Sequence, residues 1–310
     1  MSRGLAKQRG CVAAIRRGIR MKWSRRKPSG RIAYVDGRYL PHGQAGVHIE
    51  DRGLQFGDSI YEVCRIAAGQ FRDEAEHLDR LERSLGAIAM AMPVSRAALQ
   101  LICREVARRN MVTDGLLYLQ VTRGAYTRDH PIPSLAGKPT LIVTARRLDT
   151  GAIARRRETG VAVVTAPDQR WARCDIKTTQ LLANLLAKTA ARQAGAFEVW
   201  LTDSEGFVTE GASTTAWIVA ADGSLITRDL SAAVLPGVTR QVLLQAAREA
   251  QIPVVERAFT PQEAGMAREA FLTAASAAAI PIVAIDGRPV GDGKPGPLTR
   301  RLAELYAAKV

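Results

Sequence analysis

Hydrophobic and polar residues along the chain follow two periods, and the switches between them outline two α+β units. In the first unit, apolar residues three or four positions apart over 76–90 predict an amphipathic helix, and Ser95 stands where it caps a second helix. The strands predicted in this unit cover 32–35, 38–40, 60–66, 116–122 and 139–145. Residues 31–146 are therefore predicted to form a small N-terminal α/β domain.

A second unit follows a segment, 147–158, that loses periodicity and gathers charge as a linker does. Helices are predicted over 181–193, from about residue 239, and over 298–308. Strands are predicted at 161–166, 197–201, 207–219, near 254, at 270–273 and at 282–285. Residues 159–310 are therefore predicted to form a larger C-terminal domain with a mixed sheet, and the fold class is α+β.

Composition fits a globular protein, and the charge is unevenly distributed. Of the 310 residues 47% are hydrophobic and 24% charged. The formal net charge is +14, but residues 1–31 hold eleven of the 44 basic residues and no acid, which leaves 33 basic against 30 acidic residues elsewhere. Residues 1–30 are therefore predicted to be a disordered basic tail.

Three interpretations of this basic tail stay open. It binds polyanions, it is a transit peptide, or it reflects an upstream start with Met21 as the true initiator. Aromatic residues make up only 5% of the chain, so nucleic acid is not expected as a partner of the body of the protein.

Membrane insertion and disulfides are not expected either. The longest mostly apolar run, 271–285, is shorter than the roughly 20 residues that a membrane span needs, and Pro281 interrupts it. The four cysteines lie far apart without a C-x-x-C pair, which is typical of reduced thiols in a cytoplasmic protein.

Three segments carry candidate chemistry. Pro236-Gly237-Val238-Thr239 begins a predicted helix, where free backbone N–H groups favour an anion such as a phosphate. Lys177 precedes another helix, where it is either a solvated residue or a Schiff-base lysine. Glu210 lies in an apolar predicted strand, so it needs a cationic partner, either an arginine or a protonated ring nitrogen.

Six segments in one order resemble fold-type IV pyridoxal 5′-phosphate (PLP) enzymes and, within them, D-amino-acid (D-alanine) aminotransferases. The resemblance extends from about residue 31 to 310. Its segments are 50–53 (EDRG) with 55–63 (QFGDSIYEV), 76–81 (EHLDRL), 118–124 (YLQVTRG), 175–179 (DIKTT), 208–211 (VTEG) and 235–240 (LPGVTR).

The resemblance implies PLP as cofactor and a role for each matching residue. Lys177 looks like the lysine that binds PLP covalently and moves the proton, and Glu210 like the partner of the pyridine nitrogen. Arg80 resembles the arginine that binds the phosphate. The further cofactor contacts that it implies are Leu235 against the ring and Val238 and Thr239 at the phosphate. The family's usual phosphate-binding hydroxyl aligns with Ala275, so contact there is expected from the backbone or from Ser276; no metal is expected.

A loop after residue 124 suggests the substrate. Arg128 and His130, with Tyr61, resemble the carboxylate-binding set of D-amino-acid aminotransferases, and an arginine fork suits a carboxylate. In the family this loop crosses a dimer interface, which implies a homodimer acting on a D-amino acid and a 2-oxo acid. A branched-chain aminotransferase, an (R)-selective amine transaminase and aminodeoxychorismate lyase of the same fold remain alternatives.

Overall fold

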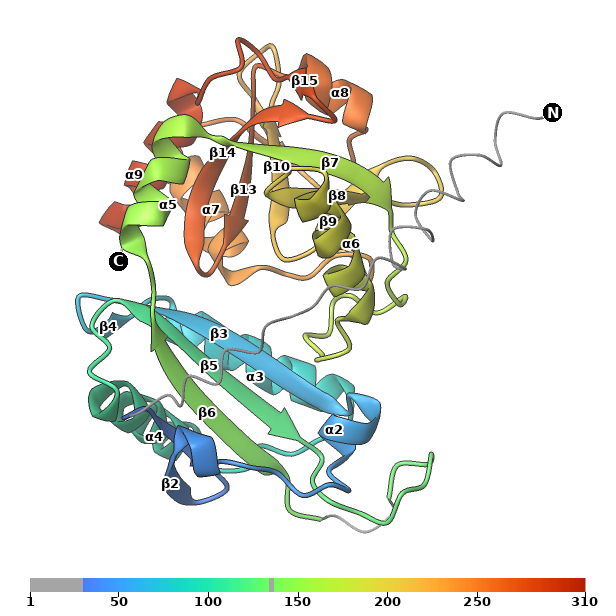
Figure 1. The fold of residues 1–310 in the computed structure, drawn as a ribbon. Coiled ribbons are helices and arrows are strands. Elements are labelled where there is room, and N and C mark those ends of the chain that lie inside the picture. Colours follow the sequence, from blue (N-terminus) through green and yellow to red (C-terminus); the bar gives the residue numbers. More distant parts are fainter. Residues whose placement is uncertain (1–29, 134–136, 310) are drawn as a thin grey trace, which may run out of the picture.

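Two α+β units stack along the long axis of the molecule (Figure 1). The computed structural model describes residues 30–133 and 137–309. The predicted α+β class is confirmed, and the first strand begins at Ile32. The predicted basic tail, residues 1–30, lies outside the described residues except for Gly30, so polyanion binding through it stays a prediction.

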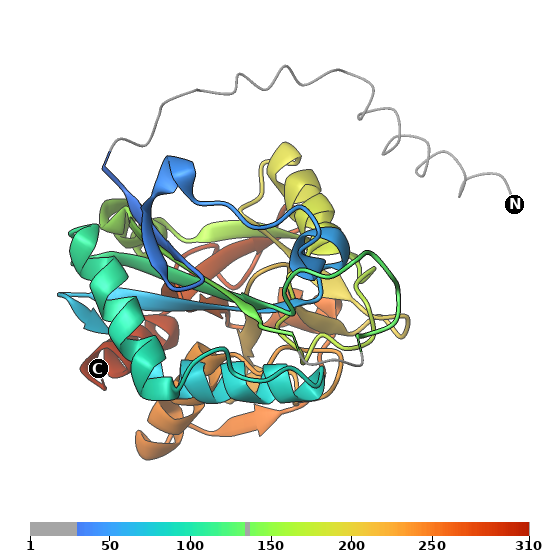
Figure 2. The ribbon, with the colours of Figure 1, turned by 90° about the horizontal axis from the view of Figure 1, so that it is seen from below.

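An antiparallel sheet forms the small domain. Its described strands run in the order β2-β1-β6-β5-β3-β4. Their bounds are β1 Ile32–Val35, β2 Arg38–Pro41, β3 Ser59–Ala67, β4 Gln70–Phe71, β5 Gly115–Thr122 and β6 Thr140–Arg147. Short helices η1 (His42–Gln44) and α2 (Arg52–Phe56) precede β3, and α3 (Glu74–Ala87) and α4 (Arg96–Arg109) follow β4. The helices α3 and α4 pack on the sheet beside one another (Figure 2).

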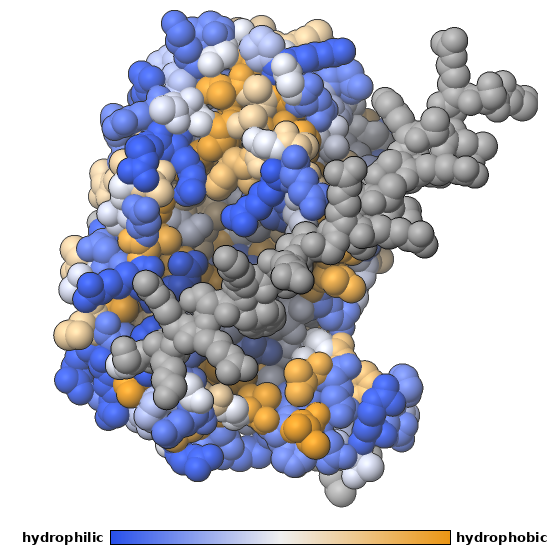
Figure 3. Space-filling view, in the orientation of Figure 1, coloured by the Kyte–Doolittle hydropathy of each residue, from blue (hydrophilic) through white to orange (hydrophobic). Residues whose placement is uncertain are grey.

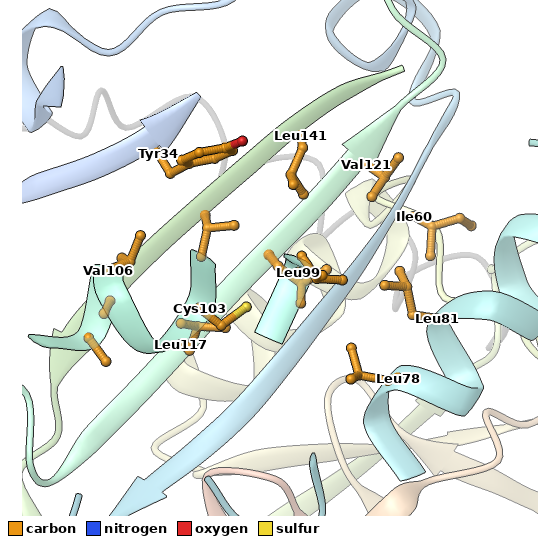
Figure 4. Packing of buried hydrophobic residues seen from close by; sticks show 14 of the residues in the cluster. Tyr34, Ile60, Leu78, Leu81, Leu99, Cys103, Val106, Leu117, Val121 and Leu141 are labelled. Atoms are coloured by element: carbon orange, nitrogen blue, oxygen red, sulfur yellow. The ribbon is translucent and has the colours of Figure 1, made fainter. Parts of the chain in front are cut away.

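Successive side chains of β3 point to opposite faces of the sheet, which are called here the core face and the cavity face. Ile60 and Ile66 are fully buried, and they lie in one cluster with Leu81 of α3 and Leu99 of α4 (Figure 4). The predicted cap of α4 is confirmed, because the Ser95 hydroxyl accepts a hydrogen bond from the Ala98 N–H at 3.3 Å. The opposite face of the sheet is free to line a site between the domains.

The segment between the two domains is helical, although its sequence shows no clear periodicity. Helix α5 covers Thr150–Thr159. Asp149 caps its first turn by accepting from the Ala152 N–H at 2.8 Å, and Gly160 follows its last turn. These local end signals, rather than an apolar stripe, mark the helix.

A mixed sheet forms the large domain, in the order β12-β11-β10-β13-β14-β7-β8-β9 with β15 on β14. Neighbouring strands are antiparallel except at β14–β7, β7–β8 and β11–β12. The strands are β7 Val161–Pro167, β8 Glu198–Thr202, β9 Val208–Gly211, β10 Thr215–Val219, β11 Leu225–Thr227, β12 Val254–Glu256, β13 Glu269–Ala274, β14 Ala277–Ile285 and β15 Arg288–Pro289. The helices are α6 Leu182–Gln193, α7 Val238–Glu249, α8 Pro261–Met266 and α9 Pro297–Ala308.

One strand prediction in this domain is wrong. The apolar run 207–219 forms two strands, β9 and β10, because the chain turns between them. The Gly211 N–H donates to the Thr214 carbonyl at 2.7 Å and closes this turn. The turn places Glu210 near the end of β9 instead of inside one long strand.

Among the described residues, every helix is too short or too polar to cross a membrane.

Candidate active site

Lys177 comes from the large-domain part of the chain but is held against the small-domain strand β3. The Tyr61 N–H donates to the Lys177 carbonyl at 3.0 Å, and Thr178 bridges to Ile60. The Lys177 amine lies 4.3 Å from the centroid of the Tyr61 ring, within the range of a cation–π contact. The backbone of β3 therefore fixes where the lysine side chain begins.

A cavity of about 800 Å³ lies between the domains and contains Lys177. Its walls include the cavity face of the small-domain sheet, through Tyr61 and Tyr118, whose rings stack with centroids 5.7 Å apart. The cavity brings together most of the predicted site: Tyr61, Arg80, Lys177, Glu210, Leu235, Val238, Thr239, Ala275 and Ser276 all line it.

One part of this cavity wall is built to bind an anion. Helix α7 begins there, and its N-cap residue Gly237 has no side chain to satisfy the free N–H groups of the first turn. Arg80 of α3 lies at the same place, because one of its terminal nitrogens donates to the Pro236 carbonyl at 3.1 Å. The small domain thus supplies a guanidinium, and the large domain supplies a helix N-terminus with the Thr239 hydroxyl.

Glu62 and His77 hold Arg80 in place, and the sequence did not reveal them as site residues. The Glu62 carboxylate is fully buried and accepts two hydrogen bonds from Arg80, each at 2.7 Å. His77 Nδ1 lies 2.8 Å from the same carboxylate. Burial opposes ionisation of Glu62, but the Arg80 charge prevails and holds its pKa at about 2. Both residues lie in segments that resemble the family, 55–63 and 76–81, but the resemblance gave them no role of their own.

Glu210 has a buried cationic partner in Arg170, which the sequence did not reveal either. The two side chains form an ion pair, and Arg170 also donates to Asp168 at 2.7 Å. Burial raises the pKa of Glu210, while the Arg170 charge and the Leu235 N–H act to lower it. The arginine expected as one alternative is therefore present, and it still leaves Glu210 on the cavity wall.

Ala275 and Ser276 form the tip of the hairpin between β13 and β14. Ala274 pairs with Ala277 across this tip, and both tip residues line the cavity. Both predicted contacts to the phosphate, the backbone at Ala275 and the hydroxyl of Ser276, therefore remain compatible with the structure.

Arg128 and His130 do not line the cavity of their own chain, and both are exposed. The Arg128 guanidinium lies 5.1 Å from the centroid of the Phe56 ring, and the His130 ring contacts the same phenylalanine at 5.7 Å. Buried Arg52 fixes the loop by donating to the Asp129 carbonyl at 2.7 Å and to the His130 carbonyl at 3.3 Å. The loop is thus anchored to α2, and these two side chains contact Phe56 of that helix instead of lining the cavity.

Comparison with known proteins gives the family. Residues 59–285 match the model of amino-transferase class IV. D-alanine aminotransferase from Bacillus licheniformis is 39% identical over 86% of this chain and 93% of its own, and that from Listeria innocua is 37% identical over 89% and 95%. The chain belongs to the class IV aminotransferase family, whose fold-type IV members use PLP.

Solved structures agree on the fold. The branched-chain amino acid aminotransferase of Escherichia coli has a TM-score of 0.83 at 25% identity and covers 90% of this chain and 94% of its own. The branched-chain aminotransferase of the archaeon Thermoproteus uzoniensis, solved with norvaline, has a TM-score of 0.77 at 25% identity, with 89% and 93% covered. Another branched-chain amino acid aminotransferase, solved with pyridoxamine 5′-phosphate, has a TM-score of 0.82 at 26% identity, with 90% and 93% covered.

The residues present fit PLP. A phosphate needs a cation and free N–H groups, which Arg80 and the start of α7 provide. A pyridine nitrogen needs a carboxylate, which Glu210 provides, and an aldehyde needs an amine, which Lys177 provides. All of these groups line one cavity, so the donor set matches the cofactor of the family.

Proposed function

We propose that this protein is a PLP-dependent D-amino-acid aminotransferase, which moves an amino group from a D-alanine-like substrate to a 2-oxo acid. The observation that carries the proposal is the single cavity that combines Lys177, Glu210, Arg80 and the start of α7. The relatives at 37–39% identity that bear the name D-alanine aminotransferase support the choice of substrate.

Each cofactor-binding residue has a proposed task. Lys177 binds PLP covalently, Arg80 with Val238 and Thr239 binds the phosphate, and Leu235 packs against the ring. The hairpin tip at 275–276 adds a phosphate contact. When bound, the cofactor supplies an electron sink for the charge that forms at the substrate α-carbon.

Proton transfer is the proposed task of Lys177 once the substrate amine has displaced its Nζ from the cofactor and left it as a free amine. Its Nζ removes the proton from the substrate α-carbon as a general base. The Tyr61 ring, 4.3 Å from this nitrogen, restricts where the amine moves. Burial raises the pKa of Glu210, and the Arg170 charge opposes this and favours the carboxylate, which would hold a proton on the ring nitrogen of bound PLP.

The substrate carboxylate is proposed to bind at Arg128 and His130 of a partner subunit, together with Tyr61 of the first. This requires a homodimer. Exposed leucines support one, since Leu54 of α2 is 64% exposed and Leu182 of α6 is 70% exposed. Helices α2 and α6 lie on the same side of the molecule (Figures 1 and 2), and apolar surface gathers around α2 (Figure 3).

Complementation between two inactive variants tests the shared site. Lys177→Ala lacks the lysine but keeps Arg128, and Arg128→Met has the reverse defect. In a mixed dimer one active site receives both residues, so co-expression restores activity that each variant lacks alone. Mixed dimers without activity contradict a site shared in this way.

Spectroscopy of the purified protein tests the cofactor and the stereochemistry together. The visible absorbance of the lysine-bound cofactor is expected to change on addition of D-alanine and not of L-alanine. The alternative of a branched-chain aminotransferase is supported by the similar solved structures, which are 25–26% identical to this chain and so less similar than the D-alanine aminotransferases. A response to L-leucine with none to D-alanine contradicts the proposal, and (R)-1-phenylethylamine and aminodeoxychorismate test the other two alternatives.

A reducing compartment suits the described cysteines, and we propose the cytoplasm. Cys64, Cys103 and Cys174 are buried free thiols.

A further inference from the structure

A hydrogen bond joins the two domains outside the cavity, close to its anion-binding end. The Tyr306 hydroxyl, on α9 of the large domain, donates to the carboxylate of Asp73 in the small domain. Figure 1 shows α9 ending beside β4 of the small domain, the strand that leads into Asp73. The bond spans residues 233 positions apart in the sequence.

Asp73 occupies a position where an aspartate usually serves its own helix. It is the N-cap residue of α3, but its side chain makes no capping hydrogen bond and its φ is +52°. An Asp at an N-cap ordinarily accepts from the first turn, and a left-handed φ costs energy for a residue other than glycine. Here the carboxylate accepts from Tyr306 instead, so the chain forgoes a local cap to make a contact between domains.

Asp73 lies on the helix that carries Arg80, and Tyr306 lies on α9, which packs on the helix that carries Val238 and Thr239. Asp73 begins α3, and two turns further along the same helix stands Arg80. On the other side, Tyr306 packs against a hydrophobic cluster that includes Leu243 and Leu244 of α7, and α9 as a whole packs on α7. The bond therefore ties the helix of the guanidinium to the helix whose N-terminus faces the cavity.

We propose that Tyr306 and Asp73 are positioning residues that hold α3 and α7 at the separation needed to bind the cofactor phosphate. A phosphate held by groups from two domains is bound tightly only when both domains are fixed relative to each other, because their rearrangement would cost binding energy. The inference rests on the proposed placement of the phosphate between Arg80 and α7. Burial together with the Asp73 charge raises the pKa of Tyr306, so the phenol stays a donor throughout the physiological range.

The test compares binding of PLP and of pyridoxal, which lacks the phosphate, to the apoprotein. Tyr306→Phe removes one hydroxyl and keeps the packed ring. It is expected to raise the dissociation constant for PLP roughly tenfold, as for loss of a hydrogen bond to a charged group, and to leave that for pyridoxal unchanged. Asp73→Gly, which removes the acceptor and tolerates the positive φ, is expected to do the same. The double variant is expected to be no weaker than the weaker single variant.

Two further variants distinguish a wrong placement of the phosphate from a wrong positioning role for Tyr306 and Asp73. Tyr39→Phe removes a phenol hydroxyl elsewhere in the small domain and is expected to bind PLP like the unaltered protein. Arg80→Met tests the phosphate placement itself, and unaltered PLP binding in that variant refutes the placement. If Arg80→Met binds PLP weakly while Tyr306→Phe and Asp73→Gly bind it normally, the placement holds and the positioning role is overturned. Equal losses for PLP and pyridoxal also overturn it, because they show a general structural defect.

Discussion

Replacing Glu62 by Gln removes the negative charge that holds Arg80 and leaves a buried guanidinium without its partner. The pKa of Glu62 falls from its ordinary 4.5 to about 2 in the folded protein. A shift of this size corresponds to about 3 kcal/mol of folding free energy from the ionised carboxylate. Breaking a buried ion pair by changing one partner costs about 3–5 kcal/mol, so Glu62→Gln is expected to destabilise the apoprotein by that amount at pH 7.

Urea unfolding of the apoprotein at several pH values measures this loss and its origin. A carboxyl whose pKa is lower in the folded than in the unfolded protein stabilises the fold at pH values above its unfolded pKa. This contribution to the free energy of unfolding disappears as the pH falls toward the pKa of the folded state. The gap between the unaltered protein and Glu62→Gln is therefore expected to narrow below pH 4.5, by about 1.4 kcal/mol for each pH unit until about pH 2. Glu105→Gln, on the exposed face of α4, is the matched control and is expected to leave the urea midpoint unchanged. Equal midpoints for Glu62→Gln and the unaltered protein at pH 7 would refute the reasoning.

The remaining predictions concern the lysine, the ring partner and one helix end. Lys177→Ala is expected to abolish both the visible absorbance of bound cofactor and transamination, while Lys138→Ala on the surface keeps both; a coloured, active Lys177→Ala protein contradicts the assignment. Arg170→Met is expected to raise the pKa of Glu210 further and to move the acid limb of kcat/KM to higher pH, whereas superimposable pH profiles count against this coupling. Ser95→Ala is expected to cost about 1 kcal/mol in urea unfolding through loss of the α4 cap, with activity retained; an unchanged midpoint shows that the cap is dispensable.

Local patterns were sufficient for most elements of this fold. The period of two along β3 predicted its two faces, and the cap at Ser95 marked the start of α4 because the signal lies within one turn. Helix α5 was missed because it has no apolar stripe, although Asp149 and Gly160 mark its ends. The apolar run 207–219 concealed a turn, because residue polarity does not change where β9 ends and β10 begins.

Site residues were predictable where the family pattern gives them a role, whereas the contacts that hold them were not, even for Glu62, which lies in the matching segment 55–63. Lys177 and Glu210 lie in such segments. Arg170 is 40 positions from Glu210, and the carboxylate of Glu62 is 18 positions from Arg80. Partners at these separations are set by how strands and helices pack, and a single sequence holds no local signal of that packing. The same applies to Asp73 and Tyr306, which lie 233 positions apart.

The attachment of Lys177 to β3 has a consequence for protein engineering. The Tyr61 N–H fixes the lysine backbone, whereas the nearby side chains of Val63 and Leu116 line the cavity without taking part in that hydrogen bond. Randomising Val63 and Leu116 therefore reshapes the cavity while the anchor of Lys177 stays in the main chain. A library at these two positions is a direct way to change substrate preference while the hydrogen bond from Tyr61 keeps the Lys177 backbone in place.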